Sequence, residues 1–401
     1  FSSDNCPMDT TQALALLGGL SPQQFMRRHW QKKPLLVRQA IAGFQPILNR
    51  PELFALAAQE RVESRLVMQG ASGWRMKSGP FAPRSLPALS KPAWSLLVQG
   101  VDLHDARAHE LLQQFRFVPD ARLDDLMISY ASTGGGVGPH YDSYDVFLLQ
   151  ASGRRRWRIG KQTDFTLQQG VPLKILQNFD YTEEFVLEAG DMLYLPPRYA
   201  HDGVAQDCAG ADGKSEACMT YSIGFRAPGQ AEIAGALLQR LAEYCSDEGQ
   251  ALATPRIYKD PRQPATANPA ALPPALTDFA RASVAAALKD PLALACALGE
   301  YLTEPKSSVW FEGGASQAAP IGSQALALDS RTRMMYEDKH IFINGESYRA
   351  QGADALLMRQ LADQRALSVA QLRKVSRDAK DLLSDWLDAG WLHTAKLKKQ
   401  P

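Results

Sequence analysis

Two histidines and one aspartate carry the strongest chemical signal in this sequence. His140 and Asp142 are two residues apart, and His201 follows a segment that begins at Gly190 and passes through Pro196. In a β-strand, residues i and i+2 point the same way, so His140 and Asp142 are predicted to reach one ion from one face. A His-x-Asp pair alone often arises by chance, and a lone His201 could be a packed residue at a strand end. The combination, with a glycine turn before His140, predicts a metal site.

The types of these ligands indicate which metal the site would hold. Two imidazoles and one carboxylate leave about three of six octahedral positions open, which is the arrangement of non-haem Fe(II) oxygenases. Structural Zn²⁺ prefers a closed shell of four ligands, usually with cysteine, and no cysteine lies near His140 or His201 in the sequence. Catalytic Zn²⁺ stays open as an alternative, although the chain lacks the His-Glu-x-x-His motif. The favoured interpretation is one Fe(II) ion that activates oxygen.

A basic strand is predicted soon after the His-x-Asp motif. Four arginines fall within residues 154–158, and strand geometry places Arg155 and Trp157 on one face and the other three arginines on the opposite face. An arginine that points into a small barrel is costly unless it meets an anion. A dicarboxylate cosubstrate that chelates the iron through its keto-acid end would supply this anion for Arg155. The alternative is a solvated basic strand or a patch that binds RNA.

The elements that must position these residues are mainly strands. Short apolar runs rich in β-branched and aromatic residues, separated by glycine and proline, dominate from about residue 63 to 226 and predict a sandwich or barrel. The clearest runs are 126–130, 146–150, 156–159, 192–195 and 220–225. Helical patterns cover 12–30 with a break at Gly18-Gly19, 51–60, 230–247, 276–303, 353–364, 368–374 and 377–389. Asn344-Gly345 predicts a hairpin turn between 341–343 and 347–349.

The bulk composition fits an ordinary globular protein of two or three domains. The chain has 401 residues, 45% of them apolar, and its net charge of +1 provides no global field for nucleic acid or membranes. Five cysteines without a Cys-x-x-Cys pair suit a reducing compartment. No run approaches the roughly 18 apolar residues of a membrane span, and the first residues show no signal-peptide pattern. We therefore expect a cytoplasmic protein.

The two motifs resemble those of a known enzyme family. Gly134-x5-His140-x-Asp142 and Gly190-x5-Pro196-x4-His201 resemble the iron-binding motifs of the cupin/JmjC-type oxygenases. The match is closer to the bacterial ribosomal oxygenases in segments 124–129, 134–147, 153–158 and 221–228, and Trp30–Val37 also resembles the N-terminal part of that family. The resemblance covers nearly the whole chain, is strongest between 122 and 228, and is looser afterwards.

The resemblance implies an α+β fold with a double-stranded β-helix core, Fe(II), and 2-oxoglutarate as cosubstrate. It implies a 2-oxoglutarate-dependent dioxygenase that hydroxylates an arginine side chain of a large-subunit ribosomal protein. His140, Asp142 and His201 stand at the family's iron positions, which makes them the expected catalytic and metal-binding residues. Arg155 stands where a basic residue binds the far carboxylate, and Ser129 stands where a residue helps to bind the cosubstrate.

One position departs from the family pattern. Some relatives carry an asparagine that touches the cosubstrate where this chain has Val146. That contact must be absent or replaced here. Tyr141, Tyr144 and Asp145 lie near the metal motif and could meet a cationic arginine substrate, although Tyr144 and Asp145 could equally be structural.

The family also implies a domain organisation. We expect a JmjC-type catalytic domain at 1–228, a helical dimerisation region at 229–312 and a winged-helix-like domain at 326–401, so the chain is expected to be a homodimer. The helices of the middle region could instead only cap the barrel. The basic end of the chain could touch nucleic acid, but a solvated tail is favoured. This basic end consists of Lys396, Lys398 and Lys399.

Two other functions would fit the same core. A methyl-lysine demethylase differs only in the carbon that is hydroxylated, and it would release formaldehyde from a methylated peptide. A non-catalytic metal-bound protein that recognises the ribosome or RNA would form no succinate from 2-oxoglutarate, and removal of the Asp142 carboxylate would leave its binding intact.

Overall fold

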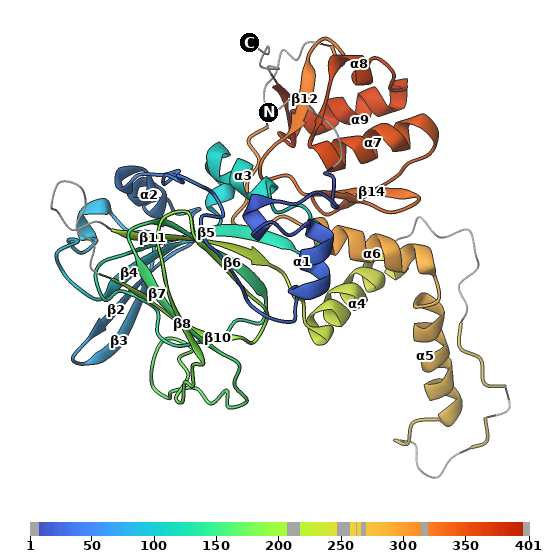
Figure 1. Cartoon of the computed structure of the whole chain (residues 1–401). Helices are drawn as coiled ribbons and strands as arrows, with labels where there is room; N and C mark the ends of the chain where they lie inside the picture. Colours follow the sequence, from blue (N-terminus) through green and yellow to red (C-terminus); the bar gives the residue numbers. More distant parts are fainter. Residues whose placement is uncertain are drawn as a thin grey trace.

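Two facing antiparallel sheets form the centre of the molecule in this computed structural model, which describes residues 8–206, 217–246, 257–261, 263–265, 270–313 and 320–395 (Figure 1). The larger sheet contains β1 (Leu35–Val37), β2 (Ser64–Gly70), β3 (Gly73–Ser78), β4 (Trp94–Val98), β5 (Leu123–Ala131), β6 (Asp145–Ser152), β9 (Met192–Leu195) and β11 (Cys218–Phe225). Their order is β1-β9-β6-β11-β5-β4-β2-β3. The smaller sheet contains β7 (Arg155–Gly160), β8 (Glu183–Leu187) and β10 (Ala200–Ala205), in the order β10-β7-β8.

Side chains of β6 alternate between two hydrophobic cores, one on each face of the larger sheet. Phe147 and Leu149 pack on the side covered by the N-terminal helices, whereas Val146 and Leu148 pack between the sheets with Trp157. Every residue of β6 is therefore buried, as expected for a central strand with both faces covered. All five strands predicted from the sequence are present.

Short helices cover the outer face of the larger sheet. They are η1 (Ala15–Leu17), α1 (Pro22–Arg28), α2 (Arg50–Ala57), η2 (Pro83–Ser85), η3 (Val101–Leu103) and α3 (Ala106–Gln113). The predicted break at Gly18-Gly19 is confirmed, since both residues have positive φ. Ser21 and Gln24 form a capping box at the start of α1, with Pro22 at the first helical position.

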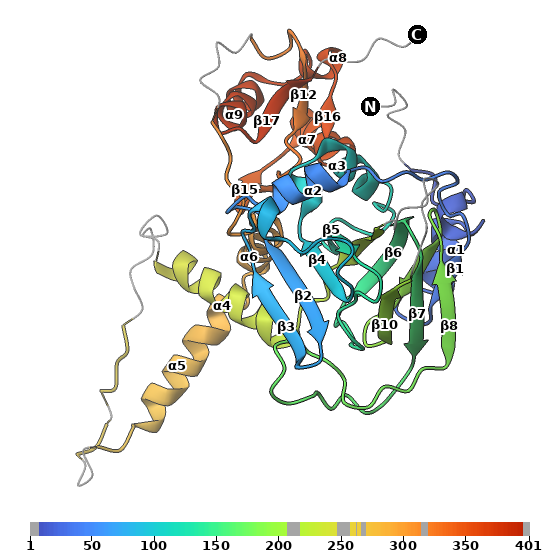
Figure 2. The ribbon, with the colours of Figure 1, turned by 90° about the vertical axis from the view of Figure 1, so that its left-hand side faces the viewer.

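Three helices follow the barrel: α4 (Gln230–Ser246), α5 (Pro274–Ala287) and α6 (Pro291–Thr303). The helical region predicted at 276–303 is present, but it is divided into α5 and α6, between which the chain bends by 66°. Asp290 caps the new helix through the backbone N–H groups of Leu292 and Ala293, and Pro291 cannot continue the preceding one. In both views α5 projects away from the rest of the molecule (Figures 1 and 2).

The C-terminal unit is a compact mixed fold with its own core around Leu361, Leu383 and Trp386. Its elements are β12 (Ala325–Leu328), β13 (Met334–Tyr336), β14 (His340–Ile343), β15 (Glu346–Arg349), α7 (Gly352–Gln364), β16 (Ala366–Leu367), α8 (Val369–Leu372), α9 (Arg377–Asp388) and β17 (Leu392–Ala395). They form the sheets β16-β12-β17 and β13-β14-β15. The predicted hairpin is confirmed: Asn344 and Gly345 form the turn between β14 and β15, both with positive φ.

Among the described helices, no single one is long and apolar enough to cross a bilayer, although the bent pair α5 and α6 together has the necessary length and composition. The basic end with Lys396, Lys398 and Lys399 lies outside the described residues.

Candidate metal centre

The glycine run before His140 lies alongside strand β10. Gly134 N–H donates to the carbonyl of Ala205, and the Ala205 N–H donates to Gly135 O at 2.9 Å. A Cβ on Gly136 would lie 2.6 Å from the carbonyl oxygen of Gly203, so only glycine allows this close approach. The same pairing continues to His140, which exchanges two backbone hydrogen bonds with His201 at 2.8 and 2.9 Å. The two imidazoles are thereby brought to opposite positions of one ladder.

Three ligand atoms converge at this point. One ligand atom each from His140, Asp142 and His201 lies within 4.8 Å of the others. The ring centroids of the two histidines are 4.2 Å apart, and His201 Nε2 is 3.6 Å from Asp142 Oδ2. His201 is buried, whereas Asp142 keeps 22% of its side chain exposed. The cluster is thus open on the side of the carboxylate.

Backbone carbonyls orient both imidazoles. Nδ1 of His140 contacts the Gly138 carbonyl at 2.8 Å, and Nδ1 of His201 contacts the Tyr199 carbonyl at 2.9 Å. A carbonyl can only accept, so each Nδ1 carries the proton and each Nε2 presents a lone pair. Burial, together with the nearby His140, lowers the pKa of His201 to about 4, although Asp142 acts in the opposite direction. A neutral imidazole with a free Nε2 is the form that binds metals.

The expected strand over 140–142 was wrong in part. His140 is a single bridge residue, and the chain leaves the ladder at Tyr141, so Asp142 lies in a loop. The corner between β9 and β10 holds that loop, because the Arg198 N–H donates to the Asp142 carbonyl at 2.7 Å. Arg198 has a φ of 61°, which a residue after Pro196-Pro197 adopts only where its surroundings enforce it.

Arg155 points into the barrel, as expected for its strand face. It is 4% exposed, and its two terminal nitrogens donate to Ser129 Oγ at 3.2 Å and to the Gly203 carbonyl at 3.3 Å. Its Nε is buried without a hydrogen-bond partner among the described residues. A buried guanidinium that meets only neutral acceptors has an uncompensated charge, which an anion would satisfy.

Two polar residues beside Ser129 were missed from the sequence. Thr220 lies directly opposite Ser129 across the β5–β11 ladder, and its Oγ1 donates to Gln150 Oε1 at 3.0 Å. Both residues are buried and belong to strands that are otherwise mostly apolar. The signal available in the sequence was the presence of a polar residue within a mostly apolar strand pattern. Val146, the departure from the family pattern, packs between the sheets.

The residues near the metal motif separate into structural and exposed ones. Asp145 is fully buried and accepts hydrogen bonds from Tyr194 Oη at 2.6 Å and from Gln31 Nε2 at 3.1 Å, besides its ion pair with Arg122. Asp145 is therefore structural. Tyr144 is 38% exposed and faces a groove next to the metal loop.

The donor set fits the pair of groups that such a site would hold. Two Nε2 atoms and one carboxylate suit Fe(II), and the unpartnered Nε of Arg155 suits the far carboxylate of a dicarboxylate. Structural Zn²⁺ is disfavoured, because the described cluster contributes three ligands and no cysteine.

Comparisons with known proteins agree with this fold. Residues 110–233 match the family model of the JmjC domain, and residues 286–393 match that of the ROXA-like winged helix. The "Ribosomal protein uL16 3-hydroxylase" of Escherichia coli (strain K12) is 37% identical over 285 residues, which cover 70% of this chain and 71% of that protein. The "Probable ribosomal oxygenase" of Haemophilus influenzae is 36% identical over 214 residues, or 52% of this chain and 50% of that protein.

Solved structures show the same fold over nearly the whole chain. The X-ray structure of E. coli ycfD has a TM-score of 0.79 at 30% identity and covers 93% of this chain and 98% of its own. The E. coli protein has also been solved with cobalt and 2-oxoglutarate, at a TM-score of 0.77.

Fold and site together define a JmjC-type oxygenase that uses Fe(II) and 2-oxoglutarate and carries a C-terminal winged helix. Within that class, the chain belongs to the family of ribosomal oxygenases.

Proposed function

We propose that this protein hydroxylates an arginine side chain of a large-subunit ribosomal protein. The observation that carries the proposal is the convergence of His140, Asp142 and His201 next to a buried, incompletely paired Arg155. The E. coli relative is a uL16 3-hydroxylase by name, which supports uL16 as the substrate and carbon 3 as the position. A ribosomal substrate would place the reaction in the cytoplasm.

Each proposed site residue has a distinct task. His140, Asp142 and His201 would hold Fe(II) through two imidazole nitrogens and one carboxylate oxygen. Arg155 and Ser129 would bind the far carboxylate of 2-oxoglutarate, with Ser129 fixing the guanidinium through its Oγ. Bound Fe(II) and 2-oxoglutarate supply the oxidising chemistry that acts on an unactivated C–H bond. Trp157, with its ring centroid 5.8 Å from that of His201, would exclude water from the inner side of the site.

The groove beside Tyr144 supports a cationic substrate. Of the carboxylates that line it, Asp124 pairs with Arg226 and Lys306, and Glu304 pairs with Arg240, whereas Glu232 has no cationic partner among the described residues. An exposed tyrosine at its edge offers a ring face to a guanidinium. The groove therefore suits an arginine side chain better than an anionic one.

Ribosomal protein mass spectrometry tests this function. Ribosomal proteins from cells with and without the gene would be compared by intact mass, followed by fragmentation of any protein that differs. We expect one additional oxygen atom on an arginine of uL16 only when the gene is present. Formaldehyde release from a methylated peptide would support a demethylase instead. Absence of succinate with Fe(II), 2-oxoglutarate and substrate present would indicate a binding protein.

We also propose that residues 229–312 mediate dimerisation, between a catalytic domain at 1–228 and a winged-helix domain at 326–401. The support is a set of exposed apolar side chains on α5, α6 and the turn that joins them. These are Leu276, Val284, Leu288, Leu292 and Leu298. Exposed leucines at such density on a projecting helix are costly in water and would be covered by a second copy.

A further inference from the structure

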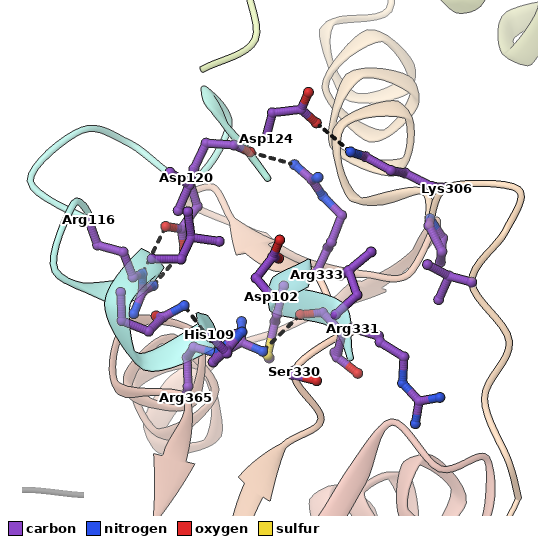
Figure 3. Close-up of a pocket in the computed structure, with 18 of the residues that line it drawn as sticks. Asp102, His109, Arg116, Asp120, Asp124, Lys306, Ser330, Arg331, Arg333 and Arg365 are labelled. Carbon is purple, nitrogen blue, oxygen red and sulfur yellow. Dashed lines mark hydrogen bonds and ion pairs between the residues drawn. The ribbon is translucent and has the colours of Figure 1, made fainter. Parts of the chain in front are cut away.

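A cavity of about 70 Å³ lies between the catalytic unit and the winged-helix unit, and none of the three metal ligands lines it. Its walls come from η3, α3, the loop after α3, the segment after α6, and the region around β13 with the end of α7 (Figure 3). Five cationic side chains line this cavity: Arg116, Lys306, Arg331, Arg333 and Arg365. Three carboxylates line it as well: Asp102, Asp120 and Asp124.

Three of the five cations have carboxylate partners. Arg116 pairs with Asp120, Lys306 with Asp124 at 3.1 Å, and Arg331 with Asp329 at 2.7 Å. The third carboxylate of the wall, Asp102, accepts a hydrogen bond from the Leu126 backbone. Burial, reinforced by Asp125, raises the pKa of Asp102 to about 7, so it carries only part of a negative charge at neutral pH.

Arg333 and Arg365 lack a carboxylate partner within ion-pair distance among the described residues. Arg333 donates only to the carbonyls of Leu302 and Leu123, at 3.2 and 3.5 Å, and Arg365 only to those of Asp329 and Thr332, at 2.6 and 3.1 Å. Burial, with help from neighbouring guanidinium groups, lowers the pKa of each to about 10, and both remain charged at neutral pH. Asp120 and Asp124 favour the charged form of Arg333, and Asp120 and Asp329 that of Arg365, but none of these carboxylates lies within ion-pair distance of either guanidinium among the described residues. Charge that is compensated only at longer range can be stabilised further by a closer anion.

His109 adds an unused donor to the same wall. The side-chain amide of Gln113 donates to His109 Nε2 at 3.1 Å, so the proton of the neutral ring is on Nδ1. Burial and the nearby Arg365 and Arg116 lower the pKa of His109 to about 3, which keeps the ring neutral. Nδ1 is buried and has no acceptor among the described residues. A buried N–H without a partner is rare and points to an absent acceptor.

We propose that this cavity is a binding site for a small free oxyanion with at least two negative charges, such as a phosphate-bearing or carboxylate-bearing metabolite. Arg333, Arg365 and His109 all line the cavity and offer donors to the oxyanion, which would add negative charge to a wall in which cations outnumber carboxylates. His109 belongs to the catalytic unit, whereas the two arginines belong to the winged-helix unit. The ligand would therefore stabilise the contact between the two units.

Thermal unfolding of the full-length, metal-free protein tests the site. Inorganic phosphate and citrate would be titrated separately at ionic strength held constant with KCl. A ligand that occupies the site, at ten times its own dissociation constant, should lower the unfolding equilibrium constant about 11-fold. Protection by phosphate alone indicates a phosphorylated ligand, and protection by citrate alone indicates a carboxylate; both support the proposal. Protection by neither would overturn it, as would protection by a short RNA strand only.

Substitutions of the two arginines test whether the protection against unfolding arises at this cavity. Arg333→Gln and Arg365→Gln should each abolish the saturable protection, whereas Arg281→Gln, which removes an exposed arginine on α5, should retain it. If the first two variants do not fold, crystals of the unaltered protein soaked in selenate provide the second measurement. Anomalous selenium density beside both guanidinium groups is expected. Density elsewhere only, or protection that survives in folded Arg333→Gln and Arg365→Gln, would contradict the site.

Discussion

Arg155 is a buried cation for which the chain itself supplies no counter-ion within hydrogen-bond distance among the described residues. Its guanidinium is buried between the two sheets, where it meets one hydroxyl and one carbonyl. A charge in such a place is stable only with a counter-ion, since desolvation is not repaid by neutral acceptors. The cosubstrate carboxylate would supply the charge, so the affinity for 2-oxoglutarate should depend on this side chain more than the affinity for iron does.

Substitution of Arg155 should therefore raise the KM for 2-oxoglutarate. Arg155→Lys keeps the charge but loses the forked geometry, and we expect an increase of roughly tenfold; Arg155→Met should raise KM roughly 100-fold, as the loss of a charge-assisted bond predicts. Iron affinity should stay within about twofold. Arg158→Met, on the same strand but paired with Glu184 at the surface, serves as the control. Equal KM values in Arg155→Met and the control would exclude Arg155 from cosubstrate binding.

A second residue-level prediction concerns His109 and pH. Its pKa is about 3 in the folded protein and ordinarily 6.5, so below pH 6.5 the unfolded chain takes up a proton that the folded chain does not. The stability that His109 contributes is present above pH 6.5 and is lost as the pH falls toward 3. In buffer free of phosphate, the unfolding free energy should fall more steeply between pH 6.5 and 5 than in His109→Gln. The difference is at most about 1.4 kcal/mol per pH unit. Identical slopes in urea titrations would contradict the assignment.

Among the elements, α6 is fixed against the winged-helix unit through a glycine. A Cβ on Gly299 would lie 2.3 Å from the ring of Phe342 on β14. Gly299→Ala should therefore destabilise the protein by roughly 1–3 kcal/mol, despite the higher helix propensity of alanine. Gly235→Ala on α4 is the matched control, because nothing lies within 4 Å of its Cβ, and it should be neutral or stabilising by up to about 1 kcal/mol. Denaturant midpoints measure both. A stabilised Gly299→Ala would mean that the contact is looser than described.

Most helices and strands could be predicted from the sequence because they depend on local periodicity. The five strands, the break at Gly18-Gly19 and the hairpin at Asn344-Gly345 all follow from residue types within a few positions. The division at Pro291 was not predicted, although Asp290-Pro291 is a local signal for a helix start. The position of Asp142 in a loop depends on its contact with Arg198, which is 56 residues away in sequence. Tertiary contacts of this kind leave no local signal.

At the scale of the whole molecule, the proposed dimer would be held by the exposed apolar side chains of α5 and α6. Val284→Asp with Leu288→Asp should place two charges on the exposed apolar face of α5 and its end, and should give a monomer in light scattering coupled to size exclusion. Leu356→Asp provides the matched control, because Leu356 is 61% exposed on α7 and should leave the dimer intact. A double variant that remains dimeric would place the interface elsewhere.

Continuous motifs could be recognised in the sequence, whereas a cluster assembled from distant segments could not. Residue types and spacing predicted the metal ligands and Arg155 because each motif is continuous or nearly so. The cluster of His109, Arg333 and Arg365 combines residues from two units more than 200 positions apart, and only their packing brings them to one cavity. Buried charge without a partner becomes visible only when the fold is known.

Anaerobic Fe(II) titration of the purified protein tests the central claim most directly. Calorimetry should detect one Fe(II) per chain, because His140, Asp142 and His201 converge on one point. Asp142→Ala should bind Fe(II) at least roughly 100-fold more weakly, while thermal unfolding in the absence of metal remains close to that of the unaltered protein. Stoichiometric Fe(II) binding with unchanged affinity in Asp142→Ala, or no binding by the unaltered protein, would contradict the account.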